Sequence, residues 1–208
     1  MKQGAAFGAL SPAVVSRETE DRLERFLDLL LRWNARINLV SGKDTGALRE
    51  RHVADSLQLL PLLPEGDGAL VDLGSGGGFP GLVLAAAVSR PVHLVEADRR
   101  KAAFLQAAAA ELGLSHVVVH PVRIEALHLP PVGVVTARAL APLTVLLPWA
   151  AELLAPEGVA IFPKGRSAEE ELDEAMAVGW TMTVERFKSS TDPNATLFRM
   201  SGIRRAGA

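Results

Sequence analysis

The residues best suited to chemistry lie in a glycine-rich segment that follows a short apolar run ending at Leu73. Asp72 stands inside this run. Gly74, Gly76 and Gly78 then follow at alternate positions. Glycine tolerates positive φ angles and lets a ligand approach the backbone closely. The pattern therefore predicts a strand, a turn and a helix that form a ligand site at the carboxyl end of the strand.

The charge around this loop discriminates between two kinds of ligand. Gly76, Gly78 and Gly81 satisfy the GxGxxG spacing of dinucleotide sites, which is a weak pattern by itself. Asp72 would repel a pyrophosphate but could receive an ammonium group, directly or through water. Pro80 removes a backbone donor that would otherwise face phosphate. Both features favour a cationic nucleoside such as S-adenosyl-L-methionine, and a nicotinamide dinucleotide is the alternative.

A further carboxylate, Glu96, ends the next apolar run about 20 residues beyond the glycines. In open sheets that bind nucleotides, an acidic residue at this place commonly accepts hydrogen bonds from ribose hydroxyls. We therefore expect Glu96 to bind the nucleoside, with a solvated strand end as the alternative interpretation.

Strands and helices must alternate to position these residues. Apolar runs of strand length occupy residues 69–73, 92–96, 117–120, 132–136 and 159–163. Helical patterns occupy residues 80–88, 99–112, 142–154 and 168–177, with Asp98 as a predicted cap of the second and Ser167 with Glu170 as a predicted capping box of the last. Residues 181–187 and 196–203 then predict an antiparallel hairpin. The whole is an α/β fold with an open, mostly parallel sheet.

The N-terminal part has a different spacing of apolar residues. Apolar residues recur at helical spacing from about residue 16 to 61, with a break at Ser41–Gly42 and a second helix expected over residues 45–60. Pro61, Pro64 and a glycine-rich turn follow. We therefore expect a helical cap over residues 1–64 and a sheet domain over residues 65–208.

Composition excludes several classes of protein. The 208 residues include no cysteine, which removes disulfides, thiolate metal sites and cysteine nucleophiles, and the five histidines show no metal-ligand spacing. The sequence has no unbroken apolar stretch of about 20 residues, and its first residues lack the apolar centre of a signal peptide. We expect a soluble, cytoplasmic protein without a metal or a membrane partner.

The net charge of −2 hides a local excess of basic residues. Between residues 29 and 54, five basic residues stand against two acidic ones; they are Arg32, Arg36, Lys43, Arg49 and Arg51, against Asp44 and Glu50. Such a face could bind the phosphates of a nucleic acid, and a mixed solvated helix surface is the alternative.

Several ordered motifs together resemble one enzyme family. The motifs are Trp33–Asn34, Asn38–Val40, Arg51–Leu57, the Gly-Phe-Pro-Gly that ends at Gly81, Arg138–Ala139 and Lys164–Gly165. Over about residues 32–166 the chain is similar to the GidB/RsmG family of 16S ribosomal RNA (guanine-N7)-methyltransferases. The resemblance implies a class I, Rossmann-like fold that uses S-adenosyl-L-methionine to methylate N7 of a guanosine in the decoding region of 16S ribosomal RNA.

The same resemblance assigns individual residues to the cofactor. The positions that match the family's cofactor contacts are Gly74, Phe79, Glu96, Ala97, Asp98, Ile124, Glu125 and Arg138. Asp72 and Gly76 are added to the expected cofactor residues because of the charge and the backbone freedom that they give the glycine loop. Arg138 lies at the end of an apolar strand, where a guanidinium needs a phosphate, a carboxylate or a guanine edge as partner. We expect Arg138 to contact the guanine.

Residues near the cap are expected to serve the RNA. Candidate phosphate contacts are Arg49, Arg51, Lys164 and Arg166. We interpret His52 as a hydrogen-bonded link between cap and sheet, oriented by Asp55 three residues later. The strand Asn194–Met200 lacks the basic ending usual in the family, which bears on RNA affinity.

Guanine N7 carries a lone pair and no proton, so its methylation needs no general base. Alignment of the two reactants alone can contribute roughly 7–11 kcal/mol. We expect a monomer that acts on 16S ribosomal RNA or on the small (30S) ribosomal subunit. The alternatives are a methyltransferase of the same fold that acts on a small molecule, and a non-catalytic protein that binds the ribosome.

Overall fold

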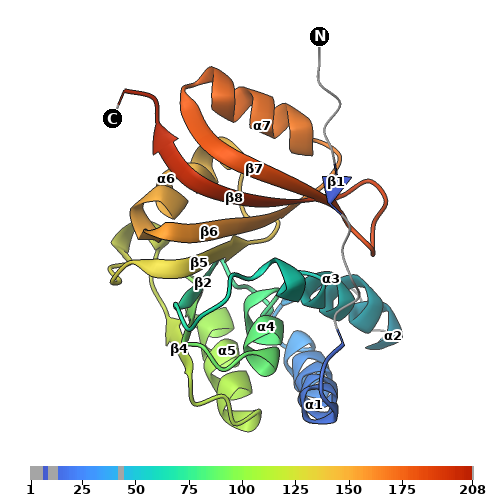
Figure 1. Cartoon of the computed structure of the whole chain (residues 1–208). Coiled ribbons are helices and arrows are strands. Elements are labelled where there is room, and N and C mark those ends of the chain that lie inside the picture. Colours follow the sequence, from blue (N-terminus) through green and yellow to red (C-terminus); the bar gives the residue numbers. More distant parts are fainter. Residues whose placement is uncertain (1–6, 9–13, 42–44, 208) are drawn as a thin grey trace.

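The computed structural model describes residues 7–8, 14–41 and 45–207. Gly42 of the expected helix break, and most of residues 1–13, lie outside these ranges. The described part contains one sheet with the strand order β1-β7-β8-β6-β5-β2-β3-β4 (Figure 1). The strands are β1 Phe7–Gly8, β2 Leu70–Leu73, β3 Val92–Val95, β4 Val117–His120, β5 Val132–Ala137, β6 Leu154–Lys164, β7 Trp180–Lys188 and β8 Thr196–Arg205.

The pairing confirms the predicted fold class. Neighbouring strands are parallel except that β8 runs antiparallel to both β6 and β7. Because β2 lies between β3 and β5, the loops after these three strands meet at one edge of the sheet. That edge, where the chain reverses its direction of winding, is where open α/β sheets bind ligands.

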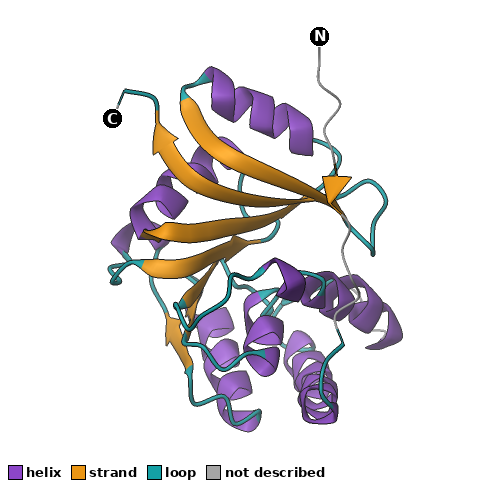
Figure 2. Ribbon diagram, viewed as in Figure 1, coloured by secondary structure: helices purple, strands orange, loops and turns teal. Residues whose placement is uncertain are grey.

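Helices cover both faces of the sheet (Figure 2). The long helices are α1 Arg17–Asn34, α4 Gly81–Ala87, α5 Arg99–Glu111, α6 Leu143–Leu153 and α7 Ala168–Ala177. Side chains of α1, α4 and α5 share one hydrophobic cluster, and those of α6 and α7 share the other. Side chains along β2 point alternately to the two faces of the sheet. Leu70 therefore belongs to the first cluster, and Val71 and Leu73 belong to the second.

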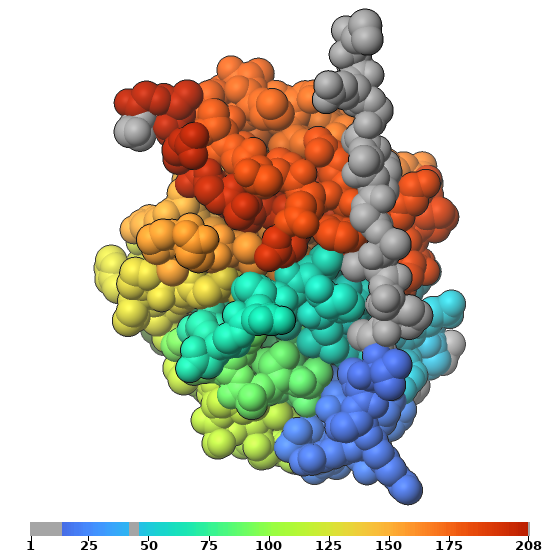
Figure 3. Space-filling view, in the orientation of Figure 1, coloured from blue at the N-terminus to red at the C-terminus, as the bar shows by residue number. Residues whose placement is uncertain are grey.

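The segment expected to form a second N-terminal helix is helical over residues 45–57, which confirms the prediction, and a π-helical section lies in its middle. Its parts are α2 Thr45–Leu48, the π-helical η1 Arg49–Ala54, α3 Asp55–Leu57 and the 3₁₀ turn η2 Leu60–Leu62. π-helical turns inside α-helices are rare and are frequently found at functional sites. We call residues 45–62 the cap segment. It lies beside the C-terminal strands (Figure 3), where Gln58 bonds to Ser189.

Caps and linkers fix the ends of these elements. Asp98 accepts hydrogen bonds from the backbone of Arg100 and Lys101, which confirms it as the cap of α5. The capping box predicted for α7 is absent from the described contacts, because the Ser167 hydroxyl bonds to the side chain of Glu171 instead. In the linker between cap and sheet, the carbonyls of Pro64, Gly66 and Gly68 each accept a hydrogen bond from the Arg90 side chain.

Candidate active site

Asp72 lies beneath the glycine loop and has no exposed surface. Its Oδ1 accepts from the Thr136 hydroxyl at 2.9 Å, and its Oδ2 accepts from the Gly81 N–H at 3.2 Å. A Cβ at Gly81 would lie 2.5 Å from this carboxylate, so the close contact requires glycine. Burial raises the pKa of Asp72 to about 6, and hydrogen bonds partly offset that effect. Asp72 thus ties β2 to β5 and α4 and fixes the loop from below.

A cleft of about 380 Å³ opens at the ends of β2 and β3, and we call it the cofactor cleft. It brings together six of the predicted cofactor residues, which are Gly74, Gly76, Glu96, Ala97, Ile124 and Glu125. Lys101, Arg123, Ala139 and Leu140 complete much of the remaining wall. An apolar side chain thus stands beside an acidic one at the 124–125 turn, as a nucleoside site requires.

Glu96 is held in a defined orientation at this cleft. Its Oε2 accepts from the Gly76 N–H at 2.9 Å, and its Oε1 accepts from the Asp98 N–H at 2.8 Å. A carboxylate oxygen can accept more than one hydrogen bond, so both oxygens retain acceptor capacity toward the cleft. Ribose hydroxyls are donors of the right kind for this group, and the donor set of the cleft therefore fits a nucleoside.

Gly74 shows why the loop needs glycine at the cleft itself. Its φ is +66°, in the left-handed region that side chains disfavour. A Cβ there would also lie 2.6 Å from Cδ1 of Leu140. Any larger residue would push Leu140 out of the wall that it forms.

Four predicted cofactor residues lie outside this lining, and one of them, Arg138, lines a neighbouring cleft instead. Asp72 is buried below the loop, Phe79 is 5% exposed and packs toward the cap segment, and Asp98 caps α5. The backbone N–H groups bonded to Asp98 lower the pKa of its carboxyl. These side chains therefore support the walls of the cleft in the described structure.

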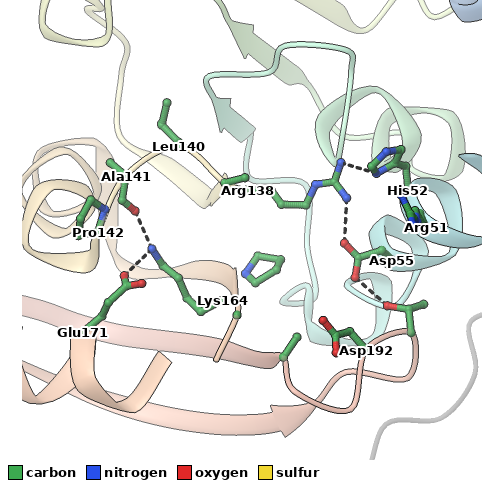
Figure 4. A pocket seen from close by; sticks show the side chains of 15 residues that line it. Arg51, His52, Asp55, Arg138, Leu140, Ala141, Pro142, Lys164, Glu171 and Asp192 are labelled. Carbon is green, nitrogen blue, oxygen red and sulfur yellow. Dashed lines mark hydrogen bonds and ion pairs between the residues drawn. The ribbon is translucent and has the colours of Figure 1, made fainter. Parts of the chain in front are cut away.

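A larger cleft of about 740 Å³ adjoins the first one, and we call it the junction cleft because cap segment and sheet meet there (Figure 4). Ala139 and Leu140 line both clefts. Ala139 has a φ of 51° although it is not glycine, a conformation that costs about 1–3 kcal/mol and clusters at ligand sites. The strained segment after β5 is thus the wall that the two clefts share.

Arg138 is the centre of the junction cleft. Its guanidinium donates to Asp55 Oδ2 at 2.9 Å and to His52 Nδ1 at 3.1 Å. The other oxygen of Asp55 accepts from Thr191 and from Gln58. The expected polar partners of Arg138 are therefore present, and they come from the cap segment. His52 is confirmed as a link between cap and sheet, whereas Asp55 bonds to Arg138 and not to His52.

The bond from Arg138 also fixes the protonation state of His52. Because a guanidinium can only donate, Nδ1 must be the unprotonated nitrogen of the ring. Burial lowers the pKa of His52, and the positive charge of Arg138 lowers it further, while Asp55 opposes the shift. His52 is consequently neutral at neutral pH and acts as an acceptor.

Phe79 joins the glycine loop to this network. Its ring lies 5.0 Å from the His52 ring and 5.3 Å from the Phe26 ring, measured between centroids. The Arg138 guanidinium carbon lies 5.4 Å from the centre of the same ring, within cation–π range. The loop, the cap segment and Arg138 are thus packed against one aromatic side chain.

Lys164 forms the opposite wall. Its ammonium group donates to the Ala141 carbonyl at 2.6 Å and pairs with Glu171 Oε2 at 2.8 Å. The same carboxylate oxygen accepts from the Leu143 N–H at the start of α6. Glu171 therefore fixes both Lys164 and the end of the segment that the two clefts share.

The structure brings only some of the predicted RNA contacts together. Arg51 and Lys164 line the junction cleft. Arg49 instead binds the carboxylates of Glu20 and Glu24 on α1. Arg166 is exposed close to Lys164 but outside the lining.

Sequence reasoning missed Glu171, Gln58 and Thr191. Glu171 stands in an acidic run that resembles any solvated helix surface. Gln58 and Thr191 are neutral residues from segments far apart in the chain. Only the folded structure shows that both donate to the same oxygen of Asp55. Thr191 lies in the connection between the two strands of the predicted hairpin, and no residue pattern singles it out.

None of the described helices is long and apolar enough to cross a membrane. Within the same residues, no group of three or more His, Cys, Asp or Glu side chains could hold a metal ion.

Comparison with solved structures places the fold. An O-methyltransferase from Bacillus cereus in complex with SAH has a TM-score of 0.58 and 16% identity, over 85% of this chain and 90% of that one. A SAM-dependent methyltransferase from Aquifex aeolicus has a TM-score of 0.59 and 14% identity, over 74% and 92% of the two chains. This chain therefore has the Rossmann-like fold that both of these methyltransferases share.

Sequence comparison identifies the family. The profile of the GidB family, rRNA small subunit methyltransferase G, matches residues 19–194. Proteins named ribosomal RNA small subunit methyltransferase G are 58% identical in Acidiphilium cryptum, over 93% of this chain and 90% of that protein, and 54% identical in Granulibacter bethesdensis, over 92% and 89%. The chain belongs to the GidB family of ribosomal RNA methyltransferases.

Proposed function

We propose that this protein methylates N7 of a guanosine in the decoding region of 16S ribosomal RNA. The observation that carries the proposal is the continuity of two clefts through Ala139 and Leu140. One cleft has the donors and acceptors of a nucleoside site, and the other is lined by Arg51, Arg138 and Lys164. The names of the relatives support RNA as the substrate.

The cofactor cleft would hold S-adenosyl-L-methionine between Gly74, Gly76, Glu96, Ala97 and the turn at Ile124–Glu125. When bound, the cofactor supplies an electrophilic methyl group on its sulfonium. Glu96 would accept from the ribose, and Asp72, Phe79 and Asp98 would hold the surrounding loop and helix. These roles follow from the acceptor geometry and packing described above.

The reaction needs alignment rather than proton transfer, because guanine N7 has a free lone pair. Arg138 is the proposed contact to the base or its phosphate, and His52 and Asp55 orient it. Methylation leaves a positive charge on the base. Pairing with Asp55 keeps the charge around Arg138 near neutral, so the product cation is not repelled.

Arg51, Lys164 and Arg166 are the proposed phosphate contacts, and Arg49 joins them only if it leaves its two glutamates. We further propose that residues 1–64 act as a substrate-facing cap on a methyltransferase domain of residues 65–208. The protein would act as a cytoplasmic monomer on 16S ribosomal RNA or on the small subunit that contains it.

Transfer of labelled methyl groups tests the proposal. The substrates are small ribosomal subunits, deproteinised small-subunit RNA and an unrelated RNA, with the modified base mapped afterwards. We expect label at N7 of one guanosine of the small-subunit RNA. Label in no RNA, although the protein binds the cofactor, would overturn the proposal and favour a small-molecule methyltransferase.

A further inference from the structure

A third concavity lies outside both clefts. It has a volume of about 720 Å³ and lies between the end of α1 and the first turns of α5. The two helices pack side by side on the same face of the sheet (Figure 1). Leu29, Trp33 and Ile37 form its apolar floor. We call it the arginine groove because of the residues at its rim.

The rim carries Arg32, Arg36 and Arg100. Arg32 and Arg100 are largely exposed and reach their nearest carboxylates only at 3.8 and 3.5 Å. Such exposed pairs are weak and are readily exchanged for another anion. The exposed side chain of Arg36 forms no ion pair within the described part of the chain. The positive charge of the rim is therefore only weakly neutralised by carboxylates of the same chain.

The floor offers a flat aromatic surface. Trp33 packs against the buried Phe104 with 5.7 Å between ring centroids, which restrains the indole. An aromatic ring beside arginines is the combination that binds single-stranded nucleic acid, because bases stack on the ring and phosphates pair with the guanidinium groups. The three rim arginines favour a polyanion over a neutral, apolar protein surface.

The groove is close to the cofactor cleft. Arg100 lines the groove and the next residue, Lys101, lines the cofactor cleft. Both residues stand in the first turn of α5, and their backbone N–H groups bond to Asp98. Two neighbouring basic residues thus connect the groove with the edge of the cofactor cleft.

We infer that the arginine groove binds a single-stranded RNA segment that flanks the modified nucleotide. The inference rests on the proposed function in that the same RNA would reach the junction cleft. The groove would form a second RNA contact, distant from Arg138 and Lys164. This contact would increase the affinity for RNA without taking part in methyl transfer. Phosphates would pair with Arg32, Arg36 and Arg100, and a base would stack on Trp33.

Removal of two arginines tests this inference. The variant Arg32→Ala/Arg36→Ala should bind a fluorescent, single-stranded 15-nucleotide RNA with a salt slope reduced by roughly 1.4, since each single-strand phosphate contact contributes about 0.7. At 0.1 M salt this corresponds to an affinity loss of roughly 25-fold that vanishes toward 1 M. The affinity for S-adenosyl-L-methionine and the rate at saturating RNA should stay unchanged.

The control variant Arg17→Ala/Arg204→Ala removes two exposed arginines elsewhere. RNA affinity and salt slope equal to those of this control would overturn the inference, even if the protein methylates ribosomal RNA. Loss of activity on assembled subunits, with unchanged affinity for the RNA, would also overturn it and indicate a protein contact. RNA binding is measured without methyl transfer, so failure of the proposed function is detected separately.

Discussion

The cofactor cleft and the junction cleft share a wall but are built in different ways. The cofactor cleft consists of backbone turns and short side chains at the ends of adjacent parallel strands. The junction cleft consists of long charged side chains from the cap segment, the ends of β5 and β6, helix α7 and the β7–β8 loop. The first is fixed by local geometry, and the second by ion pairs between distant segments.

The charged side chains at the two clefts also differ in their partners. Below the cofactor cleft, the carboxyl of Asp72 is fully buried and accepts only from neutral donors. In the junction cleft, Arg138 and Lys164 each have a carboxylate partner. The shape of the cofactor cleft therefore depends on backbone conformation. The shape of the junction cleft depends on the carboxylates that pair with Arg138 and Lys164. Four variants test this distinction.

The largest effect is expected from Gly74→Val. Its side chain would collide with Leu140 and force a β-branched residue into a left-handed conformation. We expect loss of measurable S-adenosyl-L-methionine binding by calorimetry, and with it loss of methyl transfer. Gly113→Ala is the control, because Gly113 has nearly the same φ, +67°, but open space around it. Normal cofactor binding by Gly74→Val would contradict the backbone-based account of this cleft.

The next effect concerns stability. Since the pKa of Asp72 is raised from 3.8 to about 6, the folded state binds more protons than the unfolded state between these values. Stability from this group is present below pH 4 and lost as the pH rises through 6, by about 3 kcal/mol. Asp72→Asn should therefore gain about that much relative to the wild type between pH 4 and 7.

Urea unfolding at both pH values measures this difference, with the exposed Asp173→Asn as the control. A constant difference between wild type and Asp72→Asn would show that Asp72 does not bear the cost of a buried charge.

In the junction cleft, Arg138→Ala should lower the rate of methyl transfer by roughly 100-fold, or about 2.7 kcal/mol. Cofactor affinity should change little, because the guanidinium faces the cap segment. The matched control is Arg186→Ala, which also removes an ion pair and a cation–π contact. An equal loss of cofactor affinity in Arg138→Ala would place Arg138 in the cofactor cleft and weaken the distinction.

The smallest effect is expected from Glu171→Gln, which keeps the shape but removes the charge that holds Lys164. A partly buried ion pair contributes about 1 kcal/mol, so kcat/KM for RNA should fall roughly fivefold. Glu169→Gln on the same helix is the control. If Glu171 acts by positioning Lys164, the substitution Glu171→Gln should lower kcat/KM no further in a protein that already carries Lys164→Met. A full additional loss there would refute the coupling.

The same contrast explains what could be predicted from the sequence. The glycine pattern, Glu96 and the strand periodicity are local signals, and the periodicity correctly predicted the sheet. Gly74, Gly76 and Glu96 belong to these signals and line the cofactor cleft, whereas Ala97, Ile124 and Glu125 were assigned from the family resemblance. Arg138 and its need for a partner were also predicted. The partner itself was assigned to the wrong contact, since Asp55 reaches Arg138 through a π-helical turn that no residue pattern announced.

Ion pairs between distant segments escaped prediction. Glu171 follows two other glutamates, and nothing in its spacing distinguishes it from them. The depth of Asp72 also escaped prediction: its position before the glycines indicated a carboxylate near the ligand, but alternation along β2 turns it toward α4. Local spacing predicts elements, whereas tertiary packing decides which charges meet.

The strained Ala139 has a thermodynamic consequence. Because Ala139 and Leu140 form part of both clefts, a ligand that shifts this segment in one cleft changes the free energy of binding in the other. Such a coupling is reciprocal, so RNA must alter cofactor affinity by the same factor by which the cofactor alters RNA affinity. Product release is subject to the same rule: once the methyl group has moved, the departure of either product resets the affinity for the other.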